Sequence, residues 1–193
     1  MCGRYYVDDS TEEQIRKVVK EVDPRMKWGR RGDIHPTDAA AVISAKAGNL
    51  YASDMKWGFV SSGGGLLINA RSESAAQKVS FSESLLKRRC VMPAAGFYEW
   101  NRAKEKVSFT WNSHPVFYLA GFYKRFGGEE RFIILTMPAN ESVSSVHDRM
   151  PVLLPEEEIT PWIFDSTVTG RYLTRTGPVL TRRQEYEQMS LFG

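Results

Sequence analysis

Residues 116–137, VFYLAGFYKRFGGEERFIILTM, decide the fold class of this chain. They contain two runs rich in aromatic and β-branched residues, 116–124 and 131–137, separated by a segment with two adjacent glycines. Runs of this composition are typical of β-strands, and paired glycines are typical of a flexible loop. The stretch therefore predicts two strands of an antiparallel sheet.

Short β-rich runs also occur on both sides of this stretch. They are AAVISA (40–45), LYASDMKWGFV (50–60), LLINA (66–70), CVMP (90–93), GFYEWNR (96–102), VSFTW (107–111) and MPVLL (150–154). Turn residues separate them, and this spacing predicts an antiparallel sheet or barrel. The expected class is α+β, dominated by β structure, with a few peripheral helices.

Three segments predict these helices. In the first, residues 10–13 read as a capping box followed by apolar residues at helical spacing up to Val22, and Asp23-Pro24 ends the helix. Helices are also expected near residues 82–89 and at 155–164, where a proline and acidic residues occupy the first turn.

Length and composition favour one domain with a substantial core. The chain has 193 residues, of which 42% are hydrophobic. We expect residues 1–182 to form a single domain and residues 183–193 to form a polar tail. The sequence shows no membrane-spanning run or signal peptide, so a cytoplasmic protein is expected, associated with the nucleoid if it acts on DNA. A net charge of +3 permits a nucleic-acid partner without requiring one.

Cys2 follows the initiator methionine, so removal of Met1 would give it both a thiol and a free α-amine. The pKa of a chain-terminal amine is about 7.7–8.0, well below the ~10.4 of lysine, so much more of it is neutral near pH 7. An aldehyde can form an imine with this amine and then close onto the neighbouring sulfur as a thiazolidine. The second position therefore predicts reactivity toward aldehydes.

Three further polar residues interrupt apolar runs. Strand alternation places Glu99 among apolar neighbours, which would raise its pKa and suit it to acid–base work, although a Glu paired with an Arg is the alternative. His147 precedes an apolar strand, and a lone His is more often structural than catalytic. Asn69 ends a strand, where it could either form a turn or bind a sugar or phosphate. No zinc-like spacing of ligands is present, so neither a metal nor another cofactor is expected.

An arginine follows two positions after three of these four residues, in the pairs Cys2 and Arg4, Asn69 and Arg71, and His147 and Arg149. Residues two apart in an extended chain point to the same face, so each reactive group could bring a guanidinium with it. Arginine binds phosphate oxygens in bidentate fashion, which suggests a phosphate clamp around the reactive groups. The alternative is that one or more of these arginines forms an internal ion pair.

Several segments, taken in order along the chain, resemble the SRAP (SOS-response-associated peptidase) family of abasic-site processing proteins. They are MCGRY, MKWGF, INARSE, RRCVMPAAGFYEW, LAGFY, LTMPAN and VHDRMPVLLP. The resemblance covers roughly residues 1 to 165. It implies the SRAP fold and a thiazolidine crosslink between Cys2 and the aldehyde of an abasic site in single-stranded DNA. It also implies that Asn69, Glu99 and His147 line the pocket and that the three arginines hold flanking phosphates.

The same resemblance implies an aromatic residue and a proline that stack on bases beside the lesion. Trp57 and Pro36 match these positions. Two features depart from the family pattern: Ala95 stands where an acid is common, and LAGFY replaces the commoner Leu-Trp ending. A retained Met1 would acylate the reactive amine, and whether its removal is autocatalytic stays open.

Two other functions remain open at this point. Cys2 could act as the N-terminal nucleophile of a peptidase or autoprocessing hydrolase, which would need no DNA. Alternatively, the protein could read single-stranded or modified DNA without a covalent bond, in which case it would tolerate Cys2→Ala. The crosslinking reading also allows lyase-like strand cleavage through the imine.

The end of the chain suggests a protein partner. Gln188, Leu191 and Phe192 match the Gln-x-x-Leu-Phe pentapeptide with which bacterial proteins bind the replicative sliding clamp; packing of the tail on the domain is the alternative. We expect deletion of residues 188–193 to abolish binding to a purified clamp while crosslinking to a free oligonucleotide continues. Unchanged clamp affinity after the deletion would end this hypothesis.

Overall fold

The computed structural model describes residues 2–28, 31–61 and 63–184. Its centre is a β-barrel formed by five strands of a larger sheet. The barrel strands are β4 (Ala39–Lys46), β5 (Asn49–Trp57), β9 (Arg89–Ala94), β12 (Phe117–Phe126) and β13 (Glu129–Pro138). The hydrogen-bonded order is β13, β12, β9, β4 and β5, and a parallel pairing of β5 with β13 closes the ring. The predicted β-dominated class with a barrel is confirmed.

The pairing of β5 with β13 closes the barrel. Lys56 lies opposite Arg131 and Trp57 lies opposite Phe132, at the end of β5 and near the start of β13. The Trp57 and Phe132 rings stack with centroids 6.1 Å apart, and both side chains are fully buried. Burial of these two large rings stabilises the parallel contact that closes the barrel.

Four short strands pair with strands of the barrel and extend its sheet. β8 (Asn69–Arg71) runs parallel to β13, and β14 (Arg149–Pro151) pairs antiparallel with the end of β13. The remaining members are β2 (Glu21–Val22), which pairs with β5, and β15 (Leu153–Leu154), which pairs with β12. β13 therefore positions both the Asn69 segment and the His147 segment.

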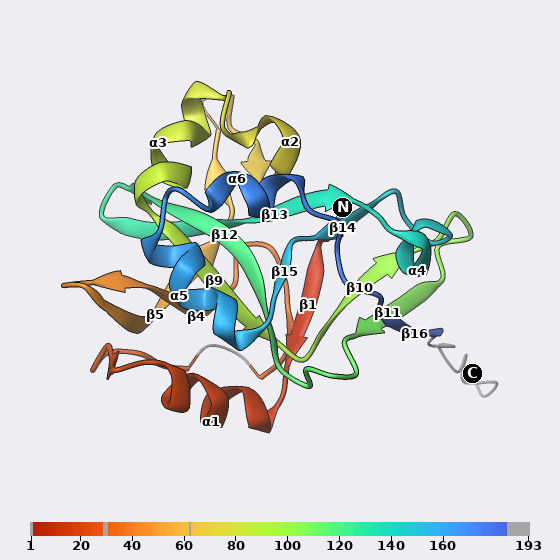
Figure 1. Ribbon diagram of the computed structural model, residues 1–193, viewed down its shortest axis with the longest axis horizontal. Helices are drawn as coiled ribbons and strands as arrows, with labels where there is room; N and C mark the ends of the chain where they lie inside the picture. Colours follow the sequence, from red (N-terminus) through yellow and green to blue (C-terminus); the bar gives the residue numbers. More distant parts are fainter. Residues whose placement is uncertain (1, 29–30, 62, 185–193) are drawn as a thin grey trace.

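A second, antiparallel sheet has five strands in the order β16 (Thr181–Gln184), β11 (Lys106–Thr110), β10 (Gly96–Trp100), β1 (Arg4–Val7) and β3 (Gly32–Ile34). Figure 1 shows β10, β11 and β16 together on one side of the molecule. β16 continues two residues past the domain end at 182 that the sequence analysis expected. β6 (Phe59–Val60) and β7 (Leu66–Leu67) form a separate hairpin.

The helices lie around the two sheets, with α1 at one edge of the molecule and α2 and α3 at the opposite edge (Figure 1). They are α1 (Asp9–Val18), α2 (Ser72–Ala75), α3 (Val79–Lys87), α4 (Glu141–Ser144), α5 (Ile159–Phe164), which follows a 3-10 turn at Glu156–Glu158, and α6 (Thr169–Thr174). The helices expected near residues 82–89 and at 155–164 are confirmed. No helix among the described residues is long and apolar enough to cross a membrane.

The first helix differs from the prediction at both ends. Its N-cap is Asp8, whose side chain accepts hydrogen bonds from the backbone amides of Ser10 and Thr11, so the capping box starts two residues earlier than expected. The helix ends at Val18, and Glu21–Val22 form β2 instead of a last helical turn. β-branched residues fit a strand well, and pairing with β5 here outweighs the apolar helical spacing.

Candidate active site

Cys2 lies two residues before the first residue of β1. Its side chain is fully buried, and its Sγ lies 3.8 Å from the carbonyl oxygen of Arg4. Burial raises the pKa of the Cys2 thiol well above its usual value, and the negative charge of Glu99 raises it further. Cys2 is therefore held as a protonated thiol near neutral pH.

Asn69 fixes the backbone of Cys2. Its side-chain Nδ2 donates a hydrogen bond of 2.9 Å to the carbonyl oxygen of Cys2, although 67 positions separate the two residues. The parallel pairing of β8 with β13, with Asn69 opposite Ile134, sets the position of this amide. Its Oδ1 is buried and accepts no hydrogen bond within the part of the chain that the structure describes. A buried acceptor of this kind can accept a hydrogen bond from a hydroxyl or amine group of a ligand.

Glu99 occupies β10, on the face of the sheet that is turned toward the core. The residue is 3% exposed. Desolvation is the main reason that its pKa rises from 4.5 to about 7. A carboxyl group with this pKa exchanges a proton readily near neutral pH, and its negative charge raises the pKa of the Cys2 thiol.

His147 lies between α4 and β14, on a segment that β13 positions. Its Nδ1 accepts a 3.0 Å hydrogen bond from the Arg149 amide and lies 2.9 Å from an Asp148 carboxylate oxygen. Desolvation lowers the His147 pKa, so the neutral imidazole predominates at pH 7. Asp148 also raises the pKa of Glu99.

The three arginines do not share one role. The Arg149 guanidinium is buried, forms a bidentate ion pair with Glu73 on α2, and donates to the carbonyl oxygen of Thr136. It therefore ties α2 to the end of the barrel, and its contact with a DNA phosphate stays a prediction. The alternative of an internal ion pair is correct for this residue.

Arg4 and Arg71 remain compatible with phosphate contacts. Arg4 pairs with Asp33 at 3.4 Å, and its side chain is 29% exposed. Arg71 is exposed and forms no hydrogen bond or ion pair with the described residues. Arg71 is the second residue after Asn69 on β8, so strand alternation places the two side chains on the same face of the strand.

The structure corrects the expectation for Trp57. Its ring is fully buried between Phe132 and Tyr5, and its Nε1 donates to the carbonyl oxygen of Ile68 at 2.9 Å. The ring therefore closes the barrel and does not offer a surface for a base. Pro36 is half-buried in the loop between β3 and β4, and its contact with DNA stays a prediction.

Sequence reasoning missed an exposed apolar surface beside Asn69. The β6–β7 hairpin exposes Val60 to 47%, and Leu66 and Leu67 to 40% each. The signal was present in the sequence, because the two adjacent leucines follow a Gly-Gly-Gly turn and cannot both face the core of a short strand. Glu73 was also missed, since nothing near it in the sequence identifies its partner.

No group of three His, Cys, Asp or Glu side chains suited to a metal ion occurs in residues 2–28, 31–61 and 63–184.

The proposed clamp-binding residues Gln188, Leu191 and Phe192 lie outside the described residues. The candidate site thus comprises a buried cysteine at the second position, an amide that donates to its carbonyl oxygen, a carboxyl group whose pKa is raised to about 7 and a histidine whose pKa is lowered. Their common role in a reaction stays a prediction.

These features define a β-barrel protein organised around an N-terminal cysteine. The family model "SOS response associated peptidase (SRAP)" matches residues 1–190, and the chain belongs to this family. The predicted family and fold are therefore confirmed.

Several relatives are named abasic site processing proteins. YoqW of Bacillus subtilis is 28% identical over 189 residues, covering 90% of this chain and 84% of its own. YedK of Escherichia coli is 24% identical, covering 84% of this chain and 79% of its own. HMCES of Gallus gallus is 30% identical over 132 residues, which are 53% of this chain and 39% of the relative.

Solved structures share the fold. A protein from Bacteroides thetaiotaomicron superimposes with a TM-score of 0.78 at 19% identity, covering 95% of this chain and 91% of that one. A protein from Bordetella bronchiseptica also gives a TM-score of 0.78, at 22% identity, and covers 96% of this chain and 100% of that one.

Proposed function

We propose that this protein captures abasic sites in single-stranded DNA as a covalent thiazolidine through Cys2, after removal of Met1, and thereby shields the lesion. The hydrogen bond from Asn69 to the Cys2 carbonyl, beside a carboxyl group with a pKa of about 7, carries the proposal. Relatives named abasic site processing proteins support the choice of substrate.

The reaction needs no external reagent. The α-amine of Cys2 attacks the aldehyde carbon of the ring-opened deoxyribose and gives a carbinolamine, which loses water to form an imine. The Cys2 sulfur then adds to the imine carbon, and the thiol proton ends on nitrogen. The ring closes between groups on neighbouring carbons, so the second step gains the full advantage of proximity.

Glu99 is the proposed proton carrier for both steps. Loss of water from the carbinolamine requires a proton at the departing oxygen, and closure of the ring requires a base for the thiol. A carboxyl group with a pKa of about 7 is present in both protonation states near neutral pH and can serve in both roles. Neutral His147 is the second proposed acid–base group, and the buried Oδ1 of Asn69 is the proposed acceptor for a sugar hydroxyl.

The proposed DNA contacts are Arg71 and Arg4 at phosphates and the apolar β6–β7 hairpin at a neighbouring base. Arg71 supports this because it is exposed beside Asn69. The hairpin supports it because Leu66 and Leu67 present apolar surface immediately before the strand that carries Asn69. Apolar side chains beside unstacked bases replace part of the lost stacking and tolerate any sequence.

The Cys2 thiol is fully buried, so the proposal requires the site to open before an aldehyde can reach the amine and the thiol. The family's peptidase description supports a second role, in which Cys2 helps to release Met1. The test of the main proposal is incubation of the processed protein with abasic and intact single-stranded oligonucleotides. A species that survives denaturing electrophoresis is expected only with the abasic strand, and peptide hydrolysis without such a species would favour the peptidase reading.

The Glu99 carboxyl group should reduce the stability of the fold at neutral and basic pH. Because its folded pKa of about 7 exceeds the unfolded value near 4.5, the folded state binds more protons, and stability falls as pH rises from about 4.5 to 7. The cost above pH 7 is about 3 kcal/mol. We expect Glu99→Gln to increase the free energy of unfolding in urea by about 2–3 kcal/mol at pH 8 and by far less at pH 4.5.

The same variant should form the DNA adduct slowly, because an amide cannot transfer the proton. Glu105→Gln is the matched control, since Glu105 is exposed in the turn between β10 and β11. Equal unfolding free energies for Glu99→Gln and the unsubstituted protein at pH 8 would contradict the assignment of a raised pKa.

A further inference from the structure

Two groups of the candidate site, Asn69 and His147, come from segments that are far apart in the sequence. Asn69 is the first residue of β8, and α2 follows this strand directly, so Glu73 on α2 lies four residues after Asn69. His147 lies two residues before Arg149, which is the first residue of β14. The distance between the two groups therefore depends on how the segments at 69–73 and 147–149 are held together.

Strand β13 runs between these two segments. Thr136 on β13 lies opposite Arg71 on β8 and also opposite Pro151 on β14, so the two short strands flank β13 at the same level. Each of the two strands has three residues, so few backbone hydrogen bonds fix either segment. Side-chain contacts therefore help to decide how closely the segments are held.

The Glu73–Arg149 ion pair links the two segments. The buried Arg149 guanidinium donates to both carboxylate oxygens of Glu73, from Nη1 and from Nη2, and its Nη2 also donates to the carbonyl oxygen of Thr136 at 2.6 Å. The hydrogen bond from Arg149 lowers the pKa of the Glu73 carboxyl group to about 2, so Glu73 is ionised near neutral pH. A bidentate pair of this kind fixes the orientation of the guanidinium as well as its position.

The backbone of Arg149 decides which nitrogen of the neutral His147 ring carries the proton. The Arg149 amide donates a 3.0 Å hydrogen bond to His147 Nδ1. A ring nitrogen that accepts a hydrogen bond carries no proton, so the proton of the neutral imidazole is on Nε2. A carboxylate oxygen of the exposed Asp148 lies 2.9 Å from the same Nδ1 and favours a proton there instead. The Arg149 amide and the Asp148 carboxylate thus favour opposite forms of the ring.

We propose that Glu73 is a positioning residue of the site: by holding Arg149 it keeps the Arg149 amide against His147 Nδ1, and so keeps the proton of the neutral imidazole on Nε2. The inference rests on the proposed function, in which His147 takes part in the reaction. Because Nδ1 is engaged within its own turn, Nε2 is the nitrogen that serves the substrate. From Nε2 the neutral ring donates a hydrogen bond to the carbinolamine oxygen, while Glu99 supplies the proton with which this oxygen leaves as water.

Loss of the Glu73 carboxylate weakens both links. The Arg149 side chain then keeps its hydrogen bond to the Thr136 carbonyl oxygen but loses its anionic partner. The turn at 147–149 can relax toward the alternative form, in which Nδ1 carries the proton and donates it in a hydrogen bond to Asp148. The Asn69 amide and the imidazole are also no longer tied to each other through α2.

The test reads the tautomer of His147 at pH 8 from the ¹⁵N chemical shifts of the ring nitrogens in protein labelled at histidine. The chain has three histidines, and His147→Gln identifies the signals of this one. We expect the Nε2–H form in the unsubstituted protein and a gain of the Nδ1–H form in Glu73→Ala. In single turnover with an abasic single strand, Glu73→Ala should form the adduct roughly tenfold more slowly.

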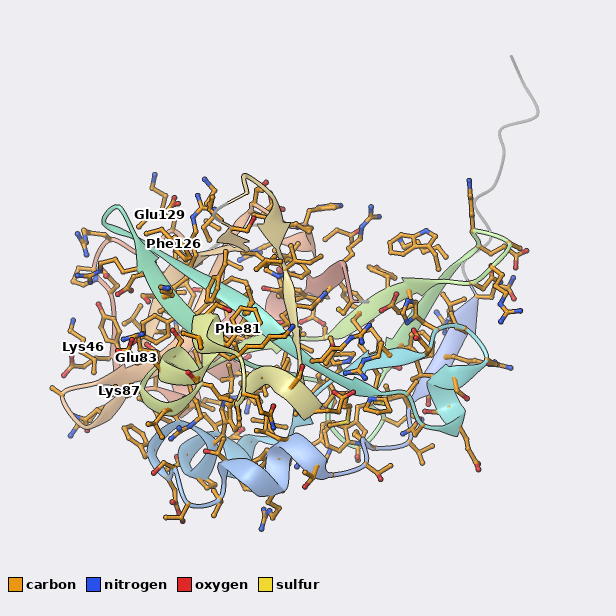
Figure 2. All side chains as sticks on the ribbon, turned by 90° about the horizontal axis from the view of Figure 1, so that it is seen from above. Lys46, Phe81, Glu83, Lys87, Phe126 and Glu129 are labelled. Atoms are coloured by element: carbon orange, nitrogen blue, oxygen red, sulfur yellow. The ribbon has the colours of Figure 1, made fainter. Side chains whose placement is uncertain are left out.

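Glu73→Gln provides a milder variant, because its amide oxygen still accepts a hydrogen bond from Arg149. It should lie between Glu73→Ala and the unsubstituted protein in both measurements, and it serves alone if Glu73→Ala folds poorly. Glu83→Ala is the matched control, since Glu83 is an exposed glutamate that pairs with Arg88 at 3.4 Å. It lies at the opposite end of the molecule from α4, which precedes the His147 segment (Figure 2). The control should change neither the tautomer nor the rate.

A proton on Nδ1 in the unsubstituted protein would overturn the inference. So would an unchanged tautomer or an unchanged rate in the Glu73 variants, because a positioning residue must alter both. A slower reaction with the original tautomer would mean that Glu73 only supports the fold. Failure of the unsubstituted protein to crosslink abasic DNA would instead reject the proposed function, because the ¹⁵N measurement involves no DNA.

Discussion

Replacement of Cys2 by alanine is expected to abolish the DNA adduct that survives denaturation. The alanine amine can still form an imine with the abasic aldehyde, but no sulfur is available to close the ring, so the bond hydrolyses or the strand is cleaved. The expected decrease in adduct on a denaturing gel is at least about a hundredfold, since the intramolecular step supplies an effective molarity that no external thiol reaches.

Cys90→Ala is the matched control for this experiment. Cys90 is equally buried, lies in β9 and is the other free cysteine of the chain. Its substitution should leave adduct formation intact. An undiminished amount of adduct with Cys2→Ala would show that a residue other than Cys2 forms the covalent bond.

The second large effect concerns stability. The Arg89 side chain is buried and donates to the carbonyl oxygens that end α3 and α5, namely Leu85 (3.1 Å), Leu86 (2.7 Å), Trp162 and Ile163 (3.2 Å). It therefore holds two helix C-termini against the barrel, where a cation also suits the helix dipoles. Burial lowers the pKa of Arg89, which shows that its hydration is lost on folding.

Arg89→Met retains much of the side-chain volume but leaves these carbonyl groups without a donor. Buried groups deprived of a charged partner cost about 3–5 kcal/mol in total, and we expect a loss of this size in the urea unfolding free energy. Arg88→Met should cost about 1 kcal/mol or less, because the Arg88 side chain is 28% exposed and pairs with an exposed glutamate. A loss below about 1 kcal/mol for Arg89→Met would contradict this role.

The sequence was sufficient to predict the β-dominated class with a barrel, and it named four candidate groups whose role at the site stays a prediction. Regular β-rich runs separated by turns define antiparallel strands, and the Gly-Gly loop between residues 116–124 and 131–137 marks the hairpin of β12 and β13. The position of a cysteine after the initiator methionine, and of a glutamate within an apolar strand, has direct chemical meaning. These features could be predicted because each depends on residues that are close together in the sequence.

Partners that come from distant segments could not be predicted in this way. Arg71 and Arg149 have the same spacing from Asn69 and His147, yet Arg149 is neutralised by Glu73, 76 positions away, and Arg71 is exposed. Trp57 closes the barrel because a parallel pairing brings it opposite Phe132. No local pattern distinguishes these outcomes, since each depends on long-range register.

The proposed role of Cys2 is tested most directly by intact mass spectrometry of the protein with and without an abasic single-stranded oligonucleotide. The free protein should lack Met1, and the complex should have the summed mass of the processed protein and the oligonucleotide minus one water. Treatment with borohydride should leave that mass unchanged, because a thiazolidine has no imine to reduce. A protein that retains Met1 and still forms the adduct, or an adduct that gains two hydrogens, would contradict the account.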